Sequence, residues 1–345
     1  MPNRSPTTSR KKEHVELTLA RDVRFRRKTT GFERLEFVHN ALPELSPQEV
    51  DTSVPFLGST LRLPFMVSCM TGGYADALAI NRRLADACRE LGIALGVGSQ
   101  RQAMEDTRFH RTFAVVREAA PSIPVVGNIG AAEVARLHDA APVLRLAELI
   151  RADAVAVHLN PLQEFLQPEG STDFRGVLRG IGMLVRELPV PVIVKEIGAG
   201  LSADVVRRLL DAGVGIIDVA GAGGTSWAGV ETLRRKDRDF PSAFWDWGIP
   251  TADALRAVAP LKREVRPFTL IGSGGVTSGF DAAVCIALGA DLAASARPVL
   301  AALRRGGTRG AVRLLRHWER QLRAVMFLTG SRTVADLQRA PLRTV

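Results

Sequence analysis

From residue 64 onward, short runs of β-branched and other apolar residues alternate with longer amphipathic segments. Apolar runs of this kind are typical of parallel strands that are covered on both faces. They predict eight strands, at Phe65–Ser68, Ile93–Val97, Val125–Gly127, Ala154–Val157, Val192–Lys195, Ile216–Val219, Thr269–Ile271 and Leu292–Ala294. Eight strands alternating with helices predict an α/β protein with a (β/α)8 TIM barrel, whereas a doubly wound sheet rarely uses so many units.

The segments between the predicted strands have helical periodicity. We expect helices at Ala75–Leu91, Ala131–Ile150, Phe174–Leu188, Ser202–Ala212 and Thr277–Leu288, the last two of which are followed by glycine. The 345 residues then divide into an N-terminal extension (1–60), a barrel (61–330) that ends in a closing helix at 306–330, and a C-terminal tail (331–345). No second domain is expected.

The chain carries a formal net charge of +10, which raises the question of nucleic acid. Much of the excess lies in two segments, from Arg4 to Lys28 and from Arg304 to Arg323, and neither is a basic motif interleaved with aromatic residues. An anionic small molecule and a solvated basic surface explain the charge equally well. We therefore expect a small-molecule partner and no nucleic acid.

The sequence contains no apolar stretch long enough to cross a membrane, and its first residues lack the apolar core of a secretory signal. Its three cysteines are too scattered for a disulfide framework or a CxxC metal site. We expect a cytoplasmic protein with no membrane partner.

Four polar side chains follow the fourth predicted strand, in the order His158-Leu-Asn160-Pro-Leu-Gln163-Glu164. Ligands of parallel α/β folds bind at the carboxyl ends of the strands, where the βα loops open. Histidine and amide side chains can hold an anion by hydrogen bonds, and a carboxylate such as Glu164 can hold Mg²⁺. A hydrogen-bonded loop at an ordinary strand end explains the same residues, so this segment alone does not distinguish a ligand-binding site from such a loop.

Glycine-rich loops follow the seventh and eighth predicted strands, at Gly272–Thr277 and Ser295–Pro298. In barrels these two loops commonly bind phosphate, because glycine lets backbone N–H groups approach the oxygens. Lys195 ends the fifth strand and should point into the barrel mouth. It could form a Schiff base, stabilise the anionic form of a reduced flavin, or pair with Glu196 or Asp218. Together the two loops and the lysine favour a phosphate-bearing cofactor.

These residues together resemble the type 2, FMN-dependent isopentenyl-diphosphate isomerase family. The resemblance extends from Arg10 to about Leu300, and its motifs are Arg10–His14, Met70–Gly73, Gly98–Arg101, His158–Glu164, Val194–Glu196, Gly223–Ser226 and Trp247–Thr251. It implies an isomerase of isoprenoid biosynthesis that interconverts isopentenyl and dimethylallyl diphosphate. It also implies reduced FMN and Mg²⁺ as cofactors, NADPH as the reductant, and a homo-oligomer, either a tetramer or an octamer.

The resemblance also implies a set of site residues. FMN contacts are expected from Cys69, Met70, Thr71, Ser99, Asn128, Lys195, Ala220, Thr225, Gly275, Val276, Thr277, Ala296 and Arg297. Substrate contacts are expected from Arg10, Lys11, His14, Ser99, Gln100, Arg101, His158, Asn160 and Gln163, with Mg²⁺ held by Glu164 against the diphosphate. The catalytic residues would be Gln163, Lys195 and His158. Ala220 stands where related sequences can carry a hydroxyl, and Cys69 is expected to contribute backbone, not thiol chemistry.

An alternative is an FMN-dependent barrel oxidoreductase that acts on a small anionic substrate. Barrels that oxidise 2-hydroxy acids use a histidine base in the loop after the sixth strand, and Ala220–Trp227 contains none. Related nucleotide dehydrogenases and reductases need a cysteine in a comparable loop, and none of the three cysteines lies there. The basic segment Arg10–His14 is also typical of a solvated helix start. It can bind substrate only by folding back over the barrel mouth, either in this chain or from a neighbouring subunit.

Overall fold

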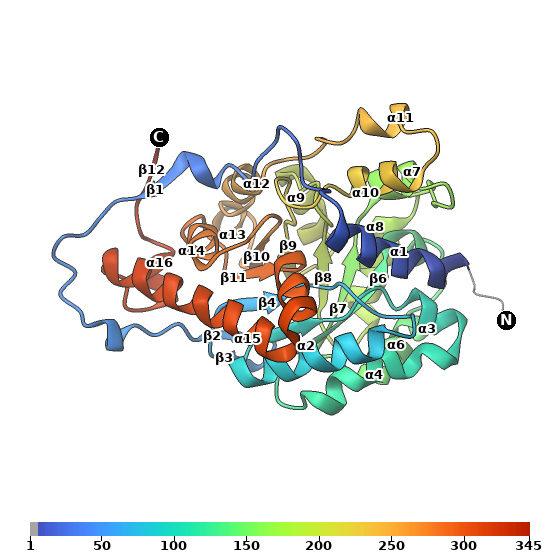
Figure 1. Ribbon diagram of the computed structural model, residues 1–345, viewed down its shortest axis with the longest axis horizontal. Helices are drawn as coiled ribbons and strands as arrows, with labels where there is room; N and C mark the ends of the chain where they lie inside the picture. Colours follow the sequence, from blue (N-terminus) through green and yellow to red (C-terminus); the bar gives the residue numbers. More distant parts are fainter. Residues whose placement is uncertain (1–5) are drawn as a thin grey trace.

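The computed structural model describes residues 6–345, and within the first helix it describes side chains from Lys11 onward. Eight parallel strands close into a barrel in the order β10-β11-β4-β5-β6-β7-β8-β9 (Figure 1). Their bounds are β4 Phe65–Val67, β5 Ala94–Gly96, β6 Val125–Gly130, β7 Ala154–His158, β8 Val192–Lys195, β9 Ile216–Asp218, β10 Thr269–Ser273 and β11 Leu292–Ser295. The predicted TIM barrel is confirmed, and all eight predicted strands are present.

Helices surround the barrel (Figure 1). The longer ones are α2 Ala77–Leu91, α4 His110–Ala119, α6 Ala141–Ile150, α8 Val177–Glu187, α9 Ala203–Asp211, α10 Trp227–Arg234, α12 Thr251–Val258 and α14 Gly279–Ala287. The shorter ones are α3 Arg101–Glu105, α5 Ala131–Val134, α7 Pro161–Leu166, α11 Asp239–Ser242 and α13 Leu261–Glu264, with 3₁₀ turns at Phe32–Arg34, Pro47–Glu49 and Thr107–Phe109.

The single helix expected at Ala131–Ile150 is wrong, because the segment forms two helices, α5 and α6. Pro142 occupies the first turn of α6, where its fixed φ and missing N–H are tolerated. Just before this start, the Asp139 carboxylate accepts a hydrogen bond from the backbone N–H of Ala141 at 2.9 Å.

The closing helix, expected at 306–330, is α15, which runs from Arg297 to Leu328. It bends at Gly306 and Gly307, whose backbone angles are not helical. Paired glycines are a recognised cause of such kinks. Although α15 is long, no helix within residues 6–345 combines the length and apolar character needed to cross a bilayer.

The N-terminal segment packs back onto the barrel of its own chain. Helix α1 (Pro6–Ala20) packs against α10 and α15. After it, the carbonyl of Val23 accepts a hydrogen bond from the N–H of Ser226 at 2.7 Å, and the N–H of Phe25 donates to Gly224 at 3.2 Å. Further on, β1 (Leu35–Phe37) pairs antiparallel with β12 (Leu342–Thr344), which follows the short α16 (Val334–Leu337). The segments before and after the barrel are therefore joined to each other.

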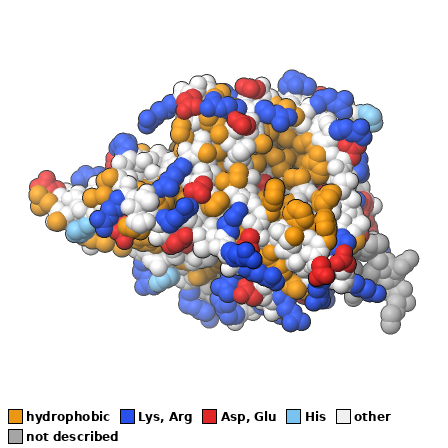
Figure 2. Space-filling model, turned by 90° about the horizontal axis from the view of Figure 1, so that it is seen from above, with side chains coloured by type: hydrophobic (Ala, Val, Ile, Leu, Met, Phe, Trp, Pro, Cys, Tyr) orange, Lys and Arg blue, Asp and Glu red, His pale blue; other side chains and the backbone are white. Residues whose placement is uncertain are grey.

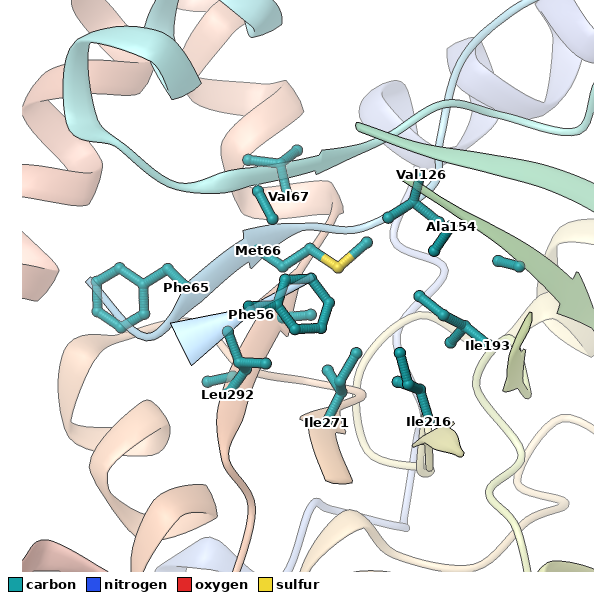
Figure 3. Close-up of a cluster of buried hydrophobic side chains, with 14 of the residues drawn as sticks. Phe56, Phe65, Met66, Val67, Val126, Ala154, Ile193, Ile216, Ile271 and Leu292 are labelled. Carbon is teal, nitrogen blue, oxygen red and sulfur yellow. The ribbon is translucent and has the colours of Figure 1, made fainter. Parts of the chain in front are cut away.

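Apolar side chains fill the barrel at the end where its strands begin (Figure 3). Met66, Ile271 and Leu292 point inward from three neighbouring strands, and each is at most 4% exposed. The ring of Phe56 lies among them and comes from β2 (Val54–Phe56), which pairs with β3 (Ser59–Leu61) just before the chain enters β4. With this end packed, the polar residues gather at the opposite, carboxyl ends of the strands.

Candidate functional site

A cavity of about 340 Å³ lies at the carboxyl ends of the strands, between the barrel and α1. That is the end where TIM barrels bind their ligands. Most of the predicted site residues line it: Lys11, His14, Cys69, Met70, Ser99, Arg101, Asn128, His158, Asn160, Gln163, Glu164, Lys195, Ala220, Thr225, Gly275, Val276, Thr277, Ala296 and Arg297. The fold thus brings residues from all eight strand ends and from the N-terminal helix into one site.

Two predicted contacts do not line this cavity. The Gln100 side chain is 1% exposed, donates to the carbonyl of Leu146 at 2.9 Å and accepts from the N–H of Asn128 at 3.1 Å. The Thr71 hydroxyl is equally buried and donates to the Asn81 side chain. Both side chains stabilise the wall behind the cavity. The side chain of Arg10 lies outside the described residues.

Helix α1 forms the roof of the cavity. Lys11 Nζ donates to the carbonyl of Ser99 at 2.7 Å and lies 5.7 Å from the centre of the Phe113 ring. At the other end of the helix, Arg297 Nε donates to the carbonyl of Thr18 at 2.7 Å. The basic N-terminal segment is therefore held over the barrel mouth by residues of the same chain.

The segment after β7 forms one hydrogen-bonded corner of the cavity. Asn160 Nδ2 donates to Gln163 Oε1 at 3.1 Å and to Glu164 Oε1 at 3.0 Å. His158 Nδ1 lies 2.9 Å from Asn128 Oδ1. Burial, with Lys195 and Lys11 nearby, lowers the pKa of His158 to about 3, so this ring enters the site neutral.

A buried acid behind this corner was not identified from the sequence. Glu231 on α10 is fully buried, and its Oε1 lies 2.9 Å from His14 Nε2 and accepts from Gln163 Nε2 at 3.1 Å. Its Oε2 accepts from Arg234 at 2.7 Å. Acidic side chains are usually exposed to solvent, so only the packing of α7 on α10 reveals this contact. Glu231 holds both the Gln163 amide and the roof helix in place.

Glu164 is the predicted metal ligand. Its Oε2 accepts from the N–H of Ser171 at 2.6 Å, which orients the carboxylate beside the cavity. A second acid, Glu133, also lines the cavity and pairs with Arg101 at 3.0 Å. Burial, with Glu164 nearby, raises the pKa of Glu133. No group of three or more His, Cys, Asp and Glu suited to a metal occurs among the described residues.

The loops after β10 and β11 form a glycine-rich cradle that lines the cavity. Gly274 and Gly275 have φ angles of 102° and 74°, and a Cβ on Gly274 would lie 2.1 Å from the Gly221 carbonyl oxygen. Ser295 Oγ donates to the carbonyl of Val276 at 2.8 Å and ties the two loops together. Because α15 starts at Arg297, the backbone amides of its first turn, which have no partner within the helix, lie beside these loops. The Arg297 side chain lines the same part of the cavity. The donor set fits the phosphate of FMN.

Several polar atoms of the cavity wall have no protein partner. Tyr74 Oη, Asn160 Oδ1 and Gln167 Nε2 are buried, and each belongs to a residue that lines the cavity. A buried polar atom without a hydrogen bond is costly, so these atoms indicate a polar ligand. Tyr74 and Gln167 were not among the predicted site residues, because no motif distinguishes them from ordinary loop residues.

The wall also contains Lys195 and Cys69. Lys195 is 6% exposed, and its Nζ donates to the carbonyl of Glu196 at 2.6 Å and lies 3.9 Å from Asp218 Oδ2. Burial raises the pKa of Cys69 to about 12, so its thiol stays protonated at neutral pH. Of these two side chains, Lys195 is therefore the one that can take part in chemistry at this wall.

Comparisons with known proteins agree with this geometry. A family model described as "FMN-dependent dehydrogenase" matches residues 5–118 and 162–344. The chain is 48% identical over 352 residues to a protein of Pelodictyon phaeoclathratiforme named isopentenyl-diphosphate delta-isomerase, covering 99% of this chain and 98% of that protein. A protein of Methanothermobacter thermautotrophicus with the same name is 45% identical over 335 residues, covering 97% and 93%.

Among solved structures, a lactate oxidase of Pediococcus acidilactici matches with a TM-score of 0.69 at 17% identity, covering 96% of this chain and 87% of that one. A mandelate oxidase matches with a TM-score of 0.67 at 19% identity, covering 96% and 94%. Likeness at such low identity shows the barrel fold alone.

Proposed function

The chain belongs to the FMN-dependent dehydrogenase family, and on that premise we propose that it interconverts isopentenyl diphosphate and dimethylallyl diphosphate, using reduced FMN and Mg²⁺. The observation that carries the proposal is the joint placement of a phosphate cradle, a buried lysine and the corner after β7 around one cavity. The relatives' shared name supports the same reaction.

The diphosphate would bind under the roof helix. Lys11, His14 and Arg101 line this part of the cavity with His158 and Asn160 from the corner after β7. Charge-assisted hydrogen bonds from such groups are stronger than neutral ones, and the orphaned Tyr74 hydroxyl and Gln167 amide can add neutral donors. Because α1 covers the mouth, a bound substrate is shielded from water.

Mg²⁺ would be held by Glu164 and completed by diphosphate oxygens and water. A cation of this kind is commonly bound through one or two carboxylates plus substrate phosphates. The two acids Glu164 and Glu133 offset part of the positive charge of the site. Without the metal, the Glu164 carboxylate and the diphosphate would repel each other.

FMN would lie across the cavity, with its phosphate at Gly275–Thr277 and Ala296–Arg297 and its ring system against Met70, Asn128 and Lys195. When reduced, it supplies acid–base chemistry to the double bond without being consumed. Lys195 contributes the positive charge that favours the anionic reduced form. NADPH is the proposed reductant.

Gln163 would orient the reacting hydrocarbon. Its amide is 9% exposed and held at both ends, by Glu231 on the nitrogen and by Asn160 on the oxygen. An amide fixed in this way presents a constant surface to the substrate and reduces the entropy lost on reaching the reactive geometry. The neutral His158 completes the wall.

We also propose a cytoplasmic homo-oligomer, a tetramer or octamer. The support is a run of aromatic rings, Phe165–Phe240–Phe244–Trp247, with successive ring centres 5.5 to 6.2 Å apart. Phe165, Phe240 and Trp247 are 56%, 49% and 61% exposed, and Figure 2 shows hydrophobic side chains gathered over the α7, α10 and α11 part of this face. Exposed apolar groups of this kind commonly mark contacts with other proteins. Light scattering of the purified protein tests the assembly.

The reaction is tested by anaerobic turnover in D₂O with pre-reduced FMN, Mg²⁺ and isopentenyl diphosphate, without NADPH. Deuterium should enter the dimethylallyl product over many turnovers per flavin. Equal activity with oxidised flavin, or one NADPH consumed per product, would contradict the proposal. The chromophore released by heat should run as FMN, and FAD would contradict the cofactor assignment.

The alternative, an oxidoreductase of small anionic substrates, has less support. The structural likeness to oxidases shows the fold alone, and Ala220–Trp227 contains no histidine. Rapid reduction of the bound flavin by lactate or mandelate, with oxygen uptake, would favour it over the isomerase.

A further inference from the structure

The buried ammonium of Lys195 needs a negative partner. It ends β8 with 6% of its surface exposed, and the carbonyl of Glu196 satisfies only one of its donors. A buried cation without a counter-ion is costly and tends to lose its proton. Two carboxylates are candidates, that of Glu196, the next residue in the chain, and that of Asp218, whose Oδ2 lies 3.9 Å from Lys195 Nζ.

The Glu196 carboxylate is used elsewhere. Its Oε2 accepts from the N–H groups of Ile197 and Gly198, each at 2.6 Å, and from that of Ala199. Three amides on one oxygen fix this side chain in the turn after β8. Its role is to stabilise the turn.

The Asp218 carboxylate, by contrast, points one oxygen at the lysine. Oδ2 lies 3.9 Å from Lys195 Nζ, while Oδ1 accepts from Ser273 Oγ at 2.5 Å and from the N–H of Ala220 at 3.2 Å. Lys195 and Asp218 are direct partners in the parallel β8–β9 pairing, and Ser273 ends the next strand, β10. Asp218 is 1% exposed and lies behind the cavity wall.

Two other titratable groups beside Lys195 are uncharged at neutral pH. His158 faces it from β7, and its pKa is lowered to about 3. Cys69 faces it from the loop after β4, and its pKa is raised to about 12. Burial raises the pKa of Asp218, and the Lys195 charge and the hydrogen bonds from Ser273 and Ala220 oppose that rise. Of the two carboxylates, Asp218 is the one whose geometry directs an oxygen at the lysine.

We propose that Asp218, oriented by Ser273, is the positioning residue that keeps Lys195 cationic, so that the barrel presents a fixed positive charge to the flavin ring. This inference rests on the proposed FMN site and concerns a residue that touches neither flavin nor substrate. In the wild type, reduction of bound FMN takes two electrons and one proton and gives the anionic reduced ring opposite a cation that is already present. Without the Asp218 charge, the buried lysine has no counter-ion while the flavin is oxidised, and we expect reduction of the flavin to be accompanied by uptake of a second proton.

The test is the two-electron midpoint potential of bound FMN between pH 6 and 9 in wild type and Asp218→Asn, with no substrate present. Asparagine keeps an oxygen that can accept from Ser273 and Ala220, so the turn is preserved and only the charge is lost. Uptake of one extra proton per reduction changes the reduction equilibrium tenfold per pH unit. For a two-electron couple, the plot of midpoint potential against pH should therefore become steeper by about 30 mV per pH unit. Asp218→Ser introduces a smaller side chain that is also uncharged, and it should steepen the pH dependence of the potential as Asp218→Asn does.

Two controls separate charge from structure. Glu196→Gln removes the other acid and should lower the melting temperature while leaving the slope unchanged. Adding Asp218→Asn to Lys195→Met should change nothing, because the extra proton resides on the lysine. Equal slopes in wild type and in both Asp218 variants, each carrying FMN, would overturn the inference while leaving the proposed function intact. A protein that binds no FMN would overturn both.

Discussion

Replacing Glu231 by Gln tests whether a buried acid holds the roof helix and the Gln163 amide in place. The carboxylate is fully buried, lies 2.9 Å from His14 Nε2 and accepts from Gln163 at 3.1 Å and Arg234 at 2.7 Å. Removing one partner of a buried ion pair costs about 3–5 kcal/mol when the other charge is left alone. Here Arg234 keeps its contacts with Glu13 and Glu169, so we expect a loss of roughly 2–3 kcal/mol.

Glu13→Gln is the matched control. Glu13 binds the same guanidinium at 3.0 Å, but its side chain is 47% exposed. Exposed ion pairs contribute about 0–1 kcal/mol, so this variant should unfold close to the wild-type urea concentration. The two variants make the same chemical change to two partners of one arginine. Glu231 is buried and also contacts His14 and Gln163, whereas the Glu13 side chain is 47% exposed.

The pH dependence gives a second readout. Burial opposes the ionised form of Glu231, but hydrogen bonds and charge from His14 and Arg234 outweigh it and lower its pKa. The stabilisation is then fully present above the ordinary carboxyl pKa of about 4.3 and is lost as pH falls through the lower folded-state value. The stability gap between wild type and Glu231→Gln should therefore be widest near neutral pH and narrow below pH 4.

Activity completes the test. Because Glu231 orients Gln163 and His14, Glu231→Gln should lower kcat/KM by about tenfold or more, which corresponds to about 1.4 kcal/mol. Glu13→Gln should leave kcat/KM near wild type. If the two variants lose the same amount of stability, or if Glu231→Gln keeps full kcat/KM, the role of this buried acid is refuted.

Three further substitutions test other parts of the cavity. Tyr74→Phe removes a buried hydroxyl that has no protein partner, so the ligand-free protein should gain about 1 kcal/mol while KM rises roughly fivefold; a loss of stability with KM unchanged would make the hydroxyl structural. Glu164→Gln should weaken the Mg²⁺ dependence and leave FMN bound, and an unaltered Mg²⁺ titration would count against Glu164 as the ligand. Lys11→Ala should lose a charge-assisted contact of about 1.5–3 kcal/mol, seen as a higher KM with little change in melting temperature; the opposite pattern would assign Lys11 to the fold.

The strands and most of the cavity could be predicted because their signals are local. The run Val192–Lys195 is buried on both faces, and the structure has the same bounds for β8. The polar residues that follow such runs must lie at one end of a parallel barrel, which is why His158, Lys195 and Gly275 meet at the same cavity. Pro142, in the first turn of α6, was also visible in the sequence as a helix-start signal, but the helical periodicity on both sides obscured the break between α5 and α6.

Other features depend on contacts between distant segments. Gln100 and Thr71 lie in motifs of the site, yet their side chains turn to Leu146 and Asn81, because their backbone positions face the wall and not the cavity. The basic segment that begins at Arg10 was compatible with a solvated helix, and its place over the barrel mouth depends on contacts such as Lys11 with Ser99. No residue near Lys11 in the sequence specifies that partner.

The sequence by itself determined the barrel and the set of chemical groups at its mouth, since hydrophobic period, β-branched runs and glycine loops act over a few residues. The tertiary structure alone decided which groups pair with which. Glu231 became a buried hub for His14 and Gln163, and Asp218 rather than Glu196 became the counter-ion of Lys195. The physical reason is that burial and charge pairing depend on what the rest of the fold brings within about 4 Å, and that distance is not a property of any single segment.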